Sequence, residues 1–330
     1  MSRQPLVIAV PSKGRLQENA AAFFARAGLP FVQRRGVLDY RGAIAGLPEA
    51  EIQFLSASEI ARELAAGAAH LGVTGEDLVR EHIADADRRV SLVSPLGFGH
   101  ANVVVAAPRA WIDVATMADL DEVAHDLHYR HGRRMRVATK YVNLTRRFFG
   151  QHGLSDYQIV ESSGATEGAP AAGSAEIIVD ITSSGATLAS NGLKALEDGT
   201  ILKSEANLVA SLVAPWSGAQ RAAAHTVLAR IAAAQAAART AEVRAAMGSA
   251  SPEHLARTLA ARGASLPFGA PDKGLPLIIH CPRAEAARLA EDLVAAGASQ
   301  VAISAMDYLF AGRVDLSEGL FAQLDARQQG

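Results

Sequence analysis

A loop of small hydroxyl residues around one glycine follows the apolar run Ile177–Val179. It comprises Asp180, Ile181, Thr182, Ser183, Ser184, Gly185, Ala186 and Thr187, and a helix-like stretch begins at Leu188. Such a loop between a strand and a helix presents backbone N–H groups and hydroxyls to one point, an arrangement that can cradle a phosphate. Asp180 at the strand end is placed to accept hydrogen bonds from sugar hydroxyls or to hold Mg²⁺ indirectly. The alternative is an ordinary N-capped helix, since serine and threonine are common caps.

Two cations lie in a second loop, directly after the apolar run Leu6–Val10, where Lys13 and Arg15 flank Gly14. Open α/β sheets bind ligands at the carboxyl ends of their strands. A guanidinium can bind a diphosphate through two parallel hydrogen bonds, and an ammonium adds a point charge. The loop therefore predicts a polyphosphate clamp, with a solvated basic loop as the alternative.

Three more segments combine small residues with polar side chains next to expected strands, and they contain Gly75 with Asp77, Lys140 with Tyr141, and Glu167. Each segment alone would be an ordinary turn. Together the five segments predict one ligand cleft between two lobes. The sequence has no complete Gly-x-x-x-x-Gly-Lys-Ser/Thr motif and no Gly-x-Gly-x-x-Gly motif, so nucleotide-hydrolase and dinucleotide-binding interpretations lose support.

Three histidines stand at intervals of three residues, at His125, His128 and His131. Acidic and basic side chains surround them throughout segment 121–134. A solvated, charged helix face explains this composition better than a metal site does.

Short apolar runs alternate with helical patterns along the first 215 residues, which is typical of α/β layers with mostly parallel strands. The alanine-rich stretch 218–248 has no internal glycine or proline, which predicts one long helix. A small unit follows over about residues 250–312, in the order helix, strand, helix, strand, with a weak opening strand near Val243–Met247. The tail after Asp315 shows no clear element.

The composition describes a globular chain of 330 residues, 49% hydrophobic and 20% charged, with a formal net charge of -2. No overall field would gather nucleic acid or an anionic membrane surface. The single cysteine, Cys281, cannot form an internal disulfide, so we expect a reducing, cytoplasmic location. The first apolar run, Pro5–Pro11, is too short to cross a membrane.

In order and approximate spacing, the five loops resemble the motifs of the ATP phosphoribosyltransferase family, in its long form. The resemblance is strong over residues 5–215. It implies a two-lobed catalytic part like that of periplasmic binding proteins, followed by a small C-terminal ferredoxin-like α+β regulatory domain. The implied parts are residues 1–99 with 190–217 for the first lobe, 100–189 for the second lobe, 218–248 for a linking helix and 249–330 for the regulatory domain and tail.

The resemblance also implies a reaction. The phosphoribosyl group of phosphoribosyl diphosphate would be transferred to N1 of ATP with release of pyrophosphate, the first step of histidine biosynthesis. Mg²⁺ would be bound mainly through the substrate diphosphate. Histidine would act as a feedback inhibitor, and the chain would form a homo-oligomer, between a dimer and a hexamer.

The resemblance assigns roles to single residues. Residues Thr182–Thr187, with Asp180 and Glu167, would bind phosphoribosyl diphosphate. Lys13 and Arg15 would face its diphosphate, and an arginine between the first two strands is placed at Arg41 in preference to Arg34 or Arg35. The ATP part of the cleft would be lined by Gly14, Gly75, Asp77, Lys140 and Tyr141.

Two other functions compete with this one. A nucleobase phosphoribosyltransferase of a different fold has a similar loop, but two adjacent acidic residues normally precede its small residues, whereas Val179 precedes Asp180 here. The second alternative is a non-catalytic, two-lobed solute-binding protein. The loop with Lys13 and Arg15 argues against it.

Overall fold

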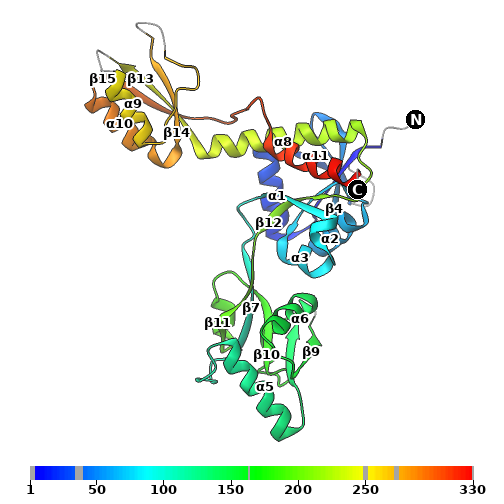
Figure 1. Ribbon diagram of the computed structural model, residues 1–330. Helices are drawn as coiled ribbons and strands as arrows, with labels where there is room; N and C mark the ends of the chain where they lie inside the picture. Colours follow the sequence, from blue (N-terminus) through cyan, green and yellow to red (C-terminus); the bar gives the residue numbers. More distant parts are fainter. Residues whose placement is uncertain (1–3, 34–39, 163, 248–251, 271–274, 329–330) are drawn as a thin grey trace.

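The computed structural model describes residues 4–33, 40–162, 164–247, 252–270 and 275–328. Three sheets form three units along the chain (Figure 1), with seven, five and three strands. Each of the two larger sheets forms the core of one lobe, and the two lobes lie next to each other. The smallest sheet lies at the far end of the long helix α8 (Gly218–Arg239).

The first lobe is built on the seven-stranded sheet, in the order β2-β3-β4-β1-β5-β12-β6. β1 pairs in parallel with β4 and β5, and β12 runs antiparallel to β5 and β6. The strands are β1 (Leu6–Pro11), β2 (Phe31–Gln33), β3 (Arg41–Ile44), β4 (Leu47–Leu55), β5 (Leu71–Gly75), β6 (Val90–Pro95) and β12 (Ala206–Ser211). The helices are α1 (Gly14–Arg26), α2 (Ala57–Ala66), α3 (Glu76–His82) and α4 (Ala86–Arg89).

The second lobe is built on the five-stranded sheet, in the order β11-β7-β10-β8-β9. Its strands are β7 (Ala101–Pro108), β8 (Met135–Thr139), β9 (Tyr157–Glu161), β10 (Ile177–Thr182) and β11 (Leu193–Ser204). Its helical segments are α5 (Met117–His131), α6 (Val142–Gln151), the short η1 (Thr166–Gly168) and α7 (Ala186–Ser190). The strand–loop–helix order expected from the sequence is thus confirmed in both lobes.

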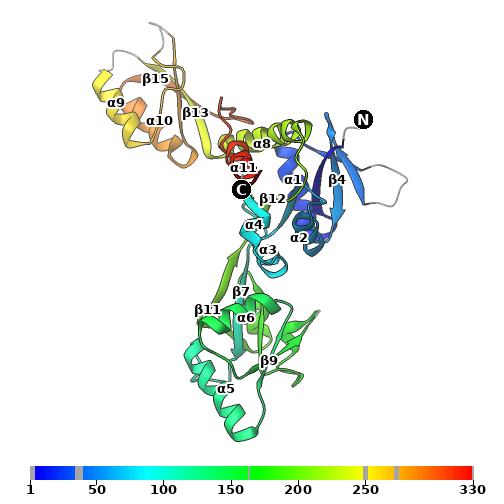
Figure 2. The same cartoon turned by 45° about the vertical axis from the view of Figure 1, so that its right-hand side comes forward.

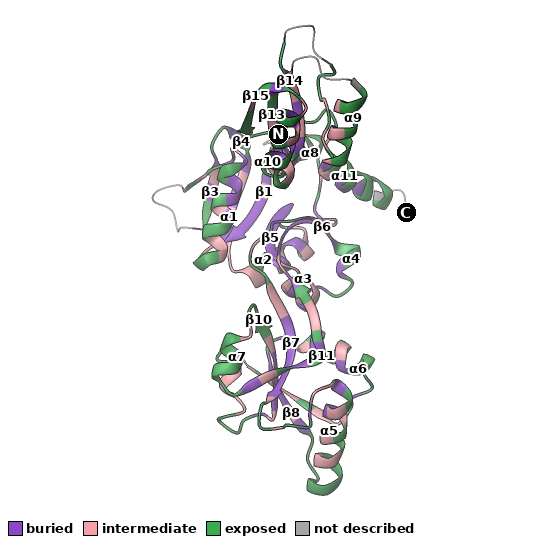
Figure 3. Ribbon diagram, turned by 90° about the vertical axis from the view of Figure 1, so that its left-hand side faces the viewer, coloured by how far each residue is buried: buried purple, intermediate pink, exposed green. Residues whose placement is uncertain are grey.

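The second lobe ends later in the chain than expected. The expected boundary at residue 189 falls before β11, which pairs antiparallel with β7 in the second sheet through Ser204. The chain therefore enters the second lobe between β6 and β7 and leaves it between β11 and β12. Figure 3 shows β7 and β11 side by side where the two lobes meet. The sequence pattern does not predict β11, because this strand contains many polar residues and no continuous apolar run.

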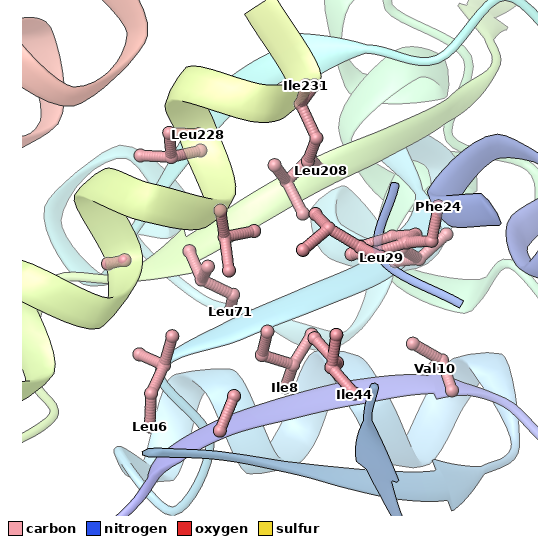
Figure 4. Packing of buried hydrophobic residues seen from close by; sticks show 14 of the residues in the cluster. Leu6, Ile8, Val10, Phe24, Leu29, Ile44, Leu71, Leu208, Leu228 and Ile231 are labelled. Carbon is pink, nitrogen blue, oxygen red and sulfur yellow. The ribbon is translucent and has the colours of Figure 1, made fainter. Parts of the chain in front are cut away.

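Helix α8 covers one face of the first sheet. Its buried side chains Leu228 and Ile231 belong to the same apolar cluster as Leu71 of β5 and Leu208 of β12, as Figure 4 shows. A Ser217–Gln220 capping box begins the helix. Truncating one of the buried leucines to alanine would cost about 2–5 kcal/mol.

The prediction of one helix over residues 218–248 is wrong beyond Arg239. The weak opening strand expected near Val243–Met247 is confirmed. Residues Thr240–Met247 form β13, the central strand of the third sheet, paired with β14 (Leu277–Pro282) and β15 (Ala298–Ala305). Every second residue of β13, Ala241, Val243 and Ala245, is buried. Pairing on both edges, with one apolar face, overrides the helix propensity of alanine.

The third unit is a small α+β domain, which confirms the predicted fold class. Its antiparallel sheet has the order β14-β13-β15. Helix α10 (Ala286–Ala295) packs on β13 and β15 and against α9 (Pro252–Ala261), and the short η2 (Arg283–Glu285) precedes it. An isolated bridge from Ser265 to His280 extends the pairing beyond β14.

The tail does contain an element, contrary to expectation, and it does not belong to the third unit. Helix α11 (Asp315–Gln328) returns to the first lobe and packs on α8 and β6 (Figure 2). Leu320 and Leu324 join the core of that lobe, and Arg221 of α8 pairs with Asp325 at 2.7 Å. Gly319 inside the helix weakened the helical pattern of this segment.

His70 ties β1 to the segment that enters α8. Its Nδ1 accepts a hydrogen bond from the Val7 N–H at 3.1 Å, and its Nε2 donates to the Pro215 carbonyl at 3.1 Å. The ring is 4% exposed and packs edge-on against Trp216, with Gln220 nearby. Burial lowers the pKa of His70 below its ordinary value, since it disfavours the charged ring.

We expect this histidine to make the fold acid-sensitive. The unfolded chain binds the proton at about pH 6.5, while the folded chain does so only at lower pH. The free energy of unfolding should therefore fall as the pH drops below about 6.5. A His70→Gln variant, followed by thermal unfolding between pH 7.5 and 5, should lose less stability over that range than the native chain. Equal losses in both proteins would contradict this role.

Candidate active site between the two lobes

A cavity of about 770 Å³ lies between the two lobes. Side chains from both lobes line it, together with the crossover segment between β6 and β7. The lining residues are Arg15, Leu16, Asn19, Ser58, Gly75, Asp77, Leu78, Glu81, His82, Gly99, His100, Ala101, Lys140, Tyr141, Ile181, Ser183 and Ala206. Six of them, Arg15, Gly75, Asp77, Lys140, Tyr141 and Ser183, are residues that the sequence singled out.

The basic loop after β1 brings one of its two cations to the cavity. Arg15 is the second residue of α1 and lines the cavity with an exposed side chain. Lys13 is the N-cap of that helix in an extended conformation, and Gly14 has a φ of 73°. Both are exposed beside the cavity lining without forming part of it. The first turn of α1 thus places a guanidinium at the cavity wall.

Two internal hydrogen bonds fix the shape of the hydroxyl-rich loop after β10. The Thr182 hydroxyl accepts from the Gly185 N–H at 2.8 Å, and the Ser184 hydroxyl accepts from the Ala186 N–H at 3.4 Å. Gly185 has a φ of 75°, which strongly favours glycine. Helix α7, which follows, has only five residues, so the N–H groups and hydroxyls, not a helix dipole, would have to hold an anion.

Two carboxylates and one ammonium surround the start of this loop. The Asp180 carboxylate accepts from the Ile181 N–H at 2.8 Å and lies 4.0 Å from Lys140 Nζ. Burial raises the pKa of Asp180, and the nearby Glu167 carboxylate raises it further. A cation or hydroxyl donor brought to Asp180 and Glu167 would relieve this cost.

A buried carboxylate at the start of α3 joins the two lobes. Asp77 is 6% exposed, and its Oδ2 accepts from the Tyr141 hydroxyl at 2.8 Å, while its Oδ1 accepts from the Ser204 hydroxyl at 2.8 Å. Burial raises the pKa of Tyr141, with the Asp77 charge adding to the effect, so the phenol stays protonated. A side chain at position 75 would collide with the Asp77 carboxylate, which explains why this position is a glycine.

A second buried carboxylate, Glu81, caps a helix of the other lobe. Its oxygens accept from the Asn143 N–H at 3.0 Å and the Leu144 N–H at 2.9 Å, at the beginning of α6. The first N–H groups of every helix have no acceptor within the helix, so they need an acceptor from elsewhere. No local pattern predicts this contact, because 62 residues separate Glu81 from Asn143. The sequence likewise does not predict the cavity residues Asn19, Ser58, His82 and His100.

Arg41 is not among the residues lining the cavity. It begins β3, which β4 separates from β1, and its exposed guanidinium lies 3.3 Å from Glu51. Arg34 and Arg35, the alternatives for this position, lie outside the described residues. Among the three histidines of α5, His128 Nδ1 lies 2.6 Å from Asp156 and His125 Nδ1 lies 3.5 Å from it, on an exposed face.

The model of the ATP phosphoribosyltransferase family matches residues 56–233. The chain is 57% identical to the ATP phosphoribosyltransferase of Afipia carboxidovorans over 322 residues, covering 98% of both proteins. It is also 57% identical to that of Bradyrhizobium diazoefficiens, with the same coverage. The chain belongs to the ATP phosphoribosyltransferase family. Its activity is therefore phosphoribosyl transfer to ATP, the first step of histidine biosynthesis.

The fold of a solved family structure agrees with this assignment. The chain matches a structure described as "ATP phosphoribosyl transferase (HisG:HisZ) complex from Thermotoga maritima" with a TM-score of 0.53 and 23% identity, over 69% of this chain and 96% of that one. Family membership decides against the nucleobase transferase and the solute-binding protein. None of the described helices is long and apolar enough to cross a membrane.

Proposed function

We propose that the cavity between the lobes holds ATP and phosphoribosyl diphosphate with adenine N1 facing C1 of the ribose. The observation that carries this proposal is the convergence of Arg15 from one lobe with Lys140 and Ser183 from the other on one cavity. Cations and small hydroxyl residues on facing walls suit two polyphosphate substrates. The apolar side chains Leu16, Leu78 and Ile181 leave room for a base between them.

The loop Thr182–Thr187 binds the 5-phosphate in this proposal. Its exposed hydroxyls and N–H groups supply neutral donors, and the positive φ of Gly185 lets the backbone turn toward an anion. Asp180 accepts hydrogen bonds from the ribose hydroxyls, assisted by Glu167. Lys140, 4.0 Å from Asp180, adds one positive charge next to the phosphate.

Arg15 stabilises the leaving group, with Lys13 beside it. In the reaction the N1 lone pair of adenine forms a bond to C1, and the C1–oxygen bond breaks with its electron pair going to pyrophosphate. Negative charge grows on that pyrophosphate in the transition state, where a fixed guanidinium lowers the barrier most directly. Because N1 already has a lone pair, this step needs no general base.

Mg²⁺ is part of the proposal. Hard oxygen donors suit this ion, and Asp180 and Glu167 supply two carboxylates whose charges lie close enough to disfavour each other. They fit a role near an ion carried mainly by the substrate diphosphate. When bound, the ion would neutralise charge on the leaving diphosphate.

The test is an assay of the purified protein with ATP, phosphoribosyl diphosphate and Mg²⁺, following both the adduct and pyrophosphate. Formation of both products in equal amounts supports the proposal. A folded, pure protein that forms neither would overturn it. Omitting Mg²⁺ in a parallel reaction tests the metal separately.

We further propose that the third unit binds histidine and lowers turnover, in a homo-oligomer. Exposed apolar side chains of this unit, Phe268, Val294 and Ile303, support contacts between copies. Inhibition requires that histidine bind two global arrangements with different affinity. Helix α8 could transmit such a change, because it packs on the sheet of the first lobe and continues directly into β13 of the third unit.

Removal of the third unit should abolish inhibition by histidine. Cutting the chain after Ser217 is unsuitable, because α8 and α11 complete the core of the first lobe. Ala238 and Met306 line the same cavity, so the chain enters and leaves the third unit at nearby points. A short Gly-Ser linker can therefore replace residues 240–305. The native protein should lose activity at millimolar histidine and the replacement variant should not. Equal sensitivity of both, or an insensitive native protein, would refute this regulation; sedimentation tests the oligomer.

A further inference from the structure

A buried phenol is one of the groups that connect the two lobes inside the cavity wall. Tyr141 belongs to the second lobe, is 1% exposed, and donates its hydroxyl proton to Asp77 of the first lobe at 2.8 Å. The Asp77 carboxylate is itself fixed, since the Ser204 hydroxyl binds its other oxygen and also accepts from the Asp77 N–H at 3.0 Å. The acceptor for Tyr141 therefore has little freedom to move.

The residues after Tyr141 are anchored to the same helix of the first lobe. Glu81, one turn beyond Asp77 on α3, accepts from the N–H groups of Asn143 and Leu144, and its carbonyl accepts from the Asn143 side-chain amide at 2.9 Å. Helices α3 and α6 pack together at the junction of the lobes (Figure 1). The segment that begins α6 is thus held by buried groups of the opposite lobe.

Lys140 directly precedes this anchored segment and takes its position from it. Its Nζ lies 5.1 Å from the centroid of the Tyr141 ring and 4.0 Å from Asp180. The Lys140 side chain is 46% exposed, so burial alone does not fix the position of its ammonium group. A long, flexible ammonium side chain is held more precisely when its backbone and a neighbouring aromatic face are both fixed.

We infer that Tyr141 is a positioning residue, which uses its hydrogen bond to Asp77 of the opposite lobe to hold Lys140 over the phosphoribosyl site. The inference rests on the proposed function of the cavity and deepens it. The contribution of Lys140 then depends on the relative placement of the lobes. The high pKa of the buried phenol keeps its proton on the donor throughout the working pH range.

A matched pair of variants of the full chain tests the inference. Tyr141→Phe removes the cross-lobe hydrogen bond made by the residue next to Lys140 and keeps the ring, while Ser204→Ala removes the cross-lobe hydrogen bond that the same carboxylate accepts from β11, away from Lys140 in the sequence. We expect Tyr141→Phe to lower kcat about 10-fold with KM values changed less than 3-fold, as expected for misplacement of a reacting-site group. Ser204→Ala should lower kcat less than 2-fold. Thermal unfolding of both variants shows whether each is folded.

A double-mutant cycle with Lys140→Ala then separates positioning from structure. If Tyr141 acts through Lys140, Tyr141→Phe should change kcat less than 2-fold in the Lys140→Ala background. An unchanged 10-fold loss in that background, or equal losses for Tyr141→Phe and Ser204→Ala, would overturn the inference. Native turnover of Lys140→Ala would overturn it too, together with the role proposed for Lys140. An inactive native protein would instead overturn the proposed function.

Discussion

Replacing Arg15 with alanine is expected to lower kcat by about 10²–10³-fold, equivalent to about 2.7–4 kcal/mol of transition-state stabilisation. The guanidinium stands at the cavity wall on the first turn of α1, where the leaving pyrophosphate would develop its charge. Groups that act on developing charge change turnover more than they change ground-state binding. Steady-state kinetics should therefore show a large loss in kcat, with the Kd for ATP nearly unchanged by calorimetry.

Arg26→Ala is the control for this prediction. Arg26 is an exposed arginine at the other end of the same helix, outside the cavity between the lobes. Its loss removes the same charge from α1, so a general electrostatic effect would appear in both variants. Unchanged turnover in Arg15→Ala, or equal losses in the two variants, would remove Arg15 from the reaction.

Replacing Gly185 with valine is expected to weaken phosphoribosyl diphosphate binding about 10–100-fold and to leave ATP binding within about 2-fold. No atom stands within 4 Å of a Cβ built at Gly185, so the cost does not come from a clash. It comes from the φ of 75°, which a β-branched residue adopts only at a cost of about 1–3 kcal/mol. Relaxation of this strain would turn the N–H groups of the loop away from the phosphate.

Gly192→Val supplies the matched control. Gly192 also has a positive φ, of 69°, and open space around a built Cβ, but it lies beyond α7, outside the loop 182–187. The two variants should lose similar thermal stability, while only Gly185→Val should lose phosphoribosyl diphosphate affinity in calorimetry. Equal losses of affinity for both ligands in Gly185→Val would contradict a 5-phosphate site at this loop.

Local patterns in the sequence were sufficient to predict most of the individual elements. Apolar runs such as Leu6–Val10 become buried strands. Polar groups at the carboxyl ends of such strands meet at one edge, which is why Arg15 and Asp77 reach the same cavity. The chemical roles of these residues stay predictions until the variants are measured.

Features that depend on distant pairing could not be predicted in this way. The alanine-rich segment of β13 has a strong helical pattern and only a weak strand pattern near Val243, and the pairing of β14 and β15 with both of its edges decides for the strand. Glu81 looks like a surface residue of an amphipathic helix until α6 presents its free N–H groups to it. In both cases tertiary contacts decide the outcome, and single-sequence patterns do not contain them.

The return of α11 to the first lobe sets the order in which the chain can fold during synthesis. The second lobe and the third sheet are each built from one continuous stretch, so each can form as soon as its own residues have emerged. The first lobe cannot, because Leu320 and Leu324 share a core with Leu6 and Ile8. Contacts between segments far apart in the chain, such as those of α11 with β6, form late and slowly. The first lobe, which forms one wall of the cavity, is therefore completed only when nearly the whole chain has been synthesised.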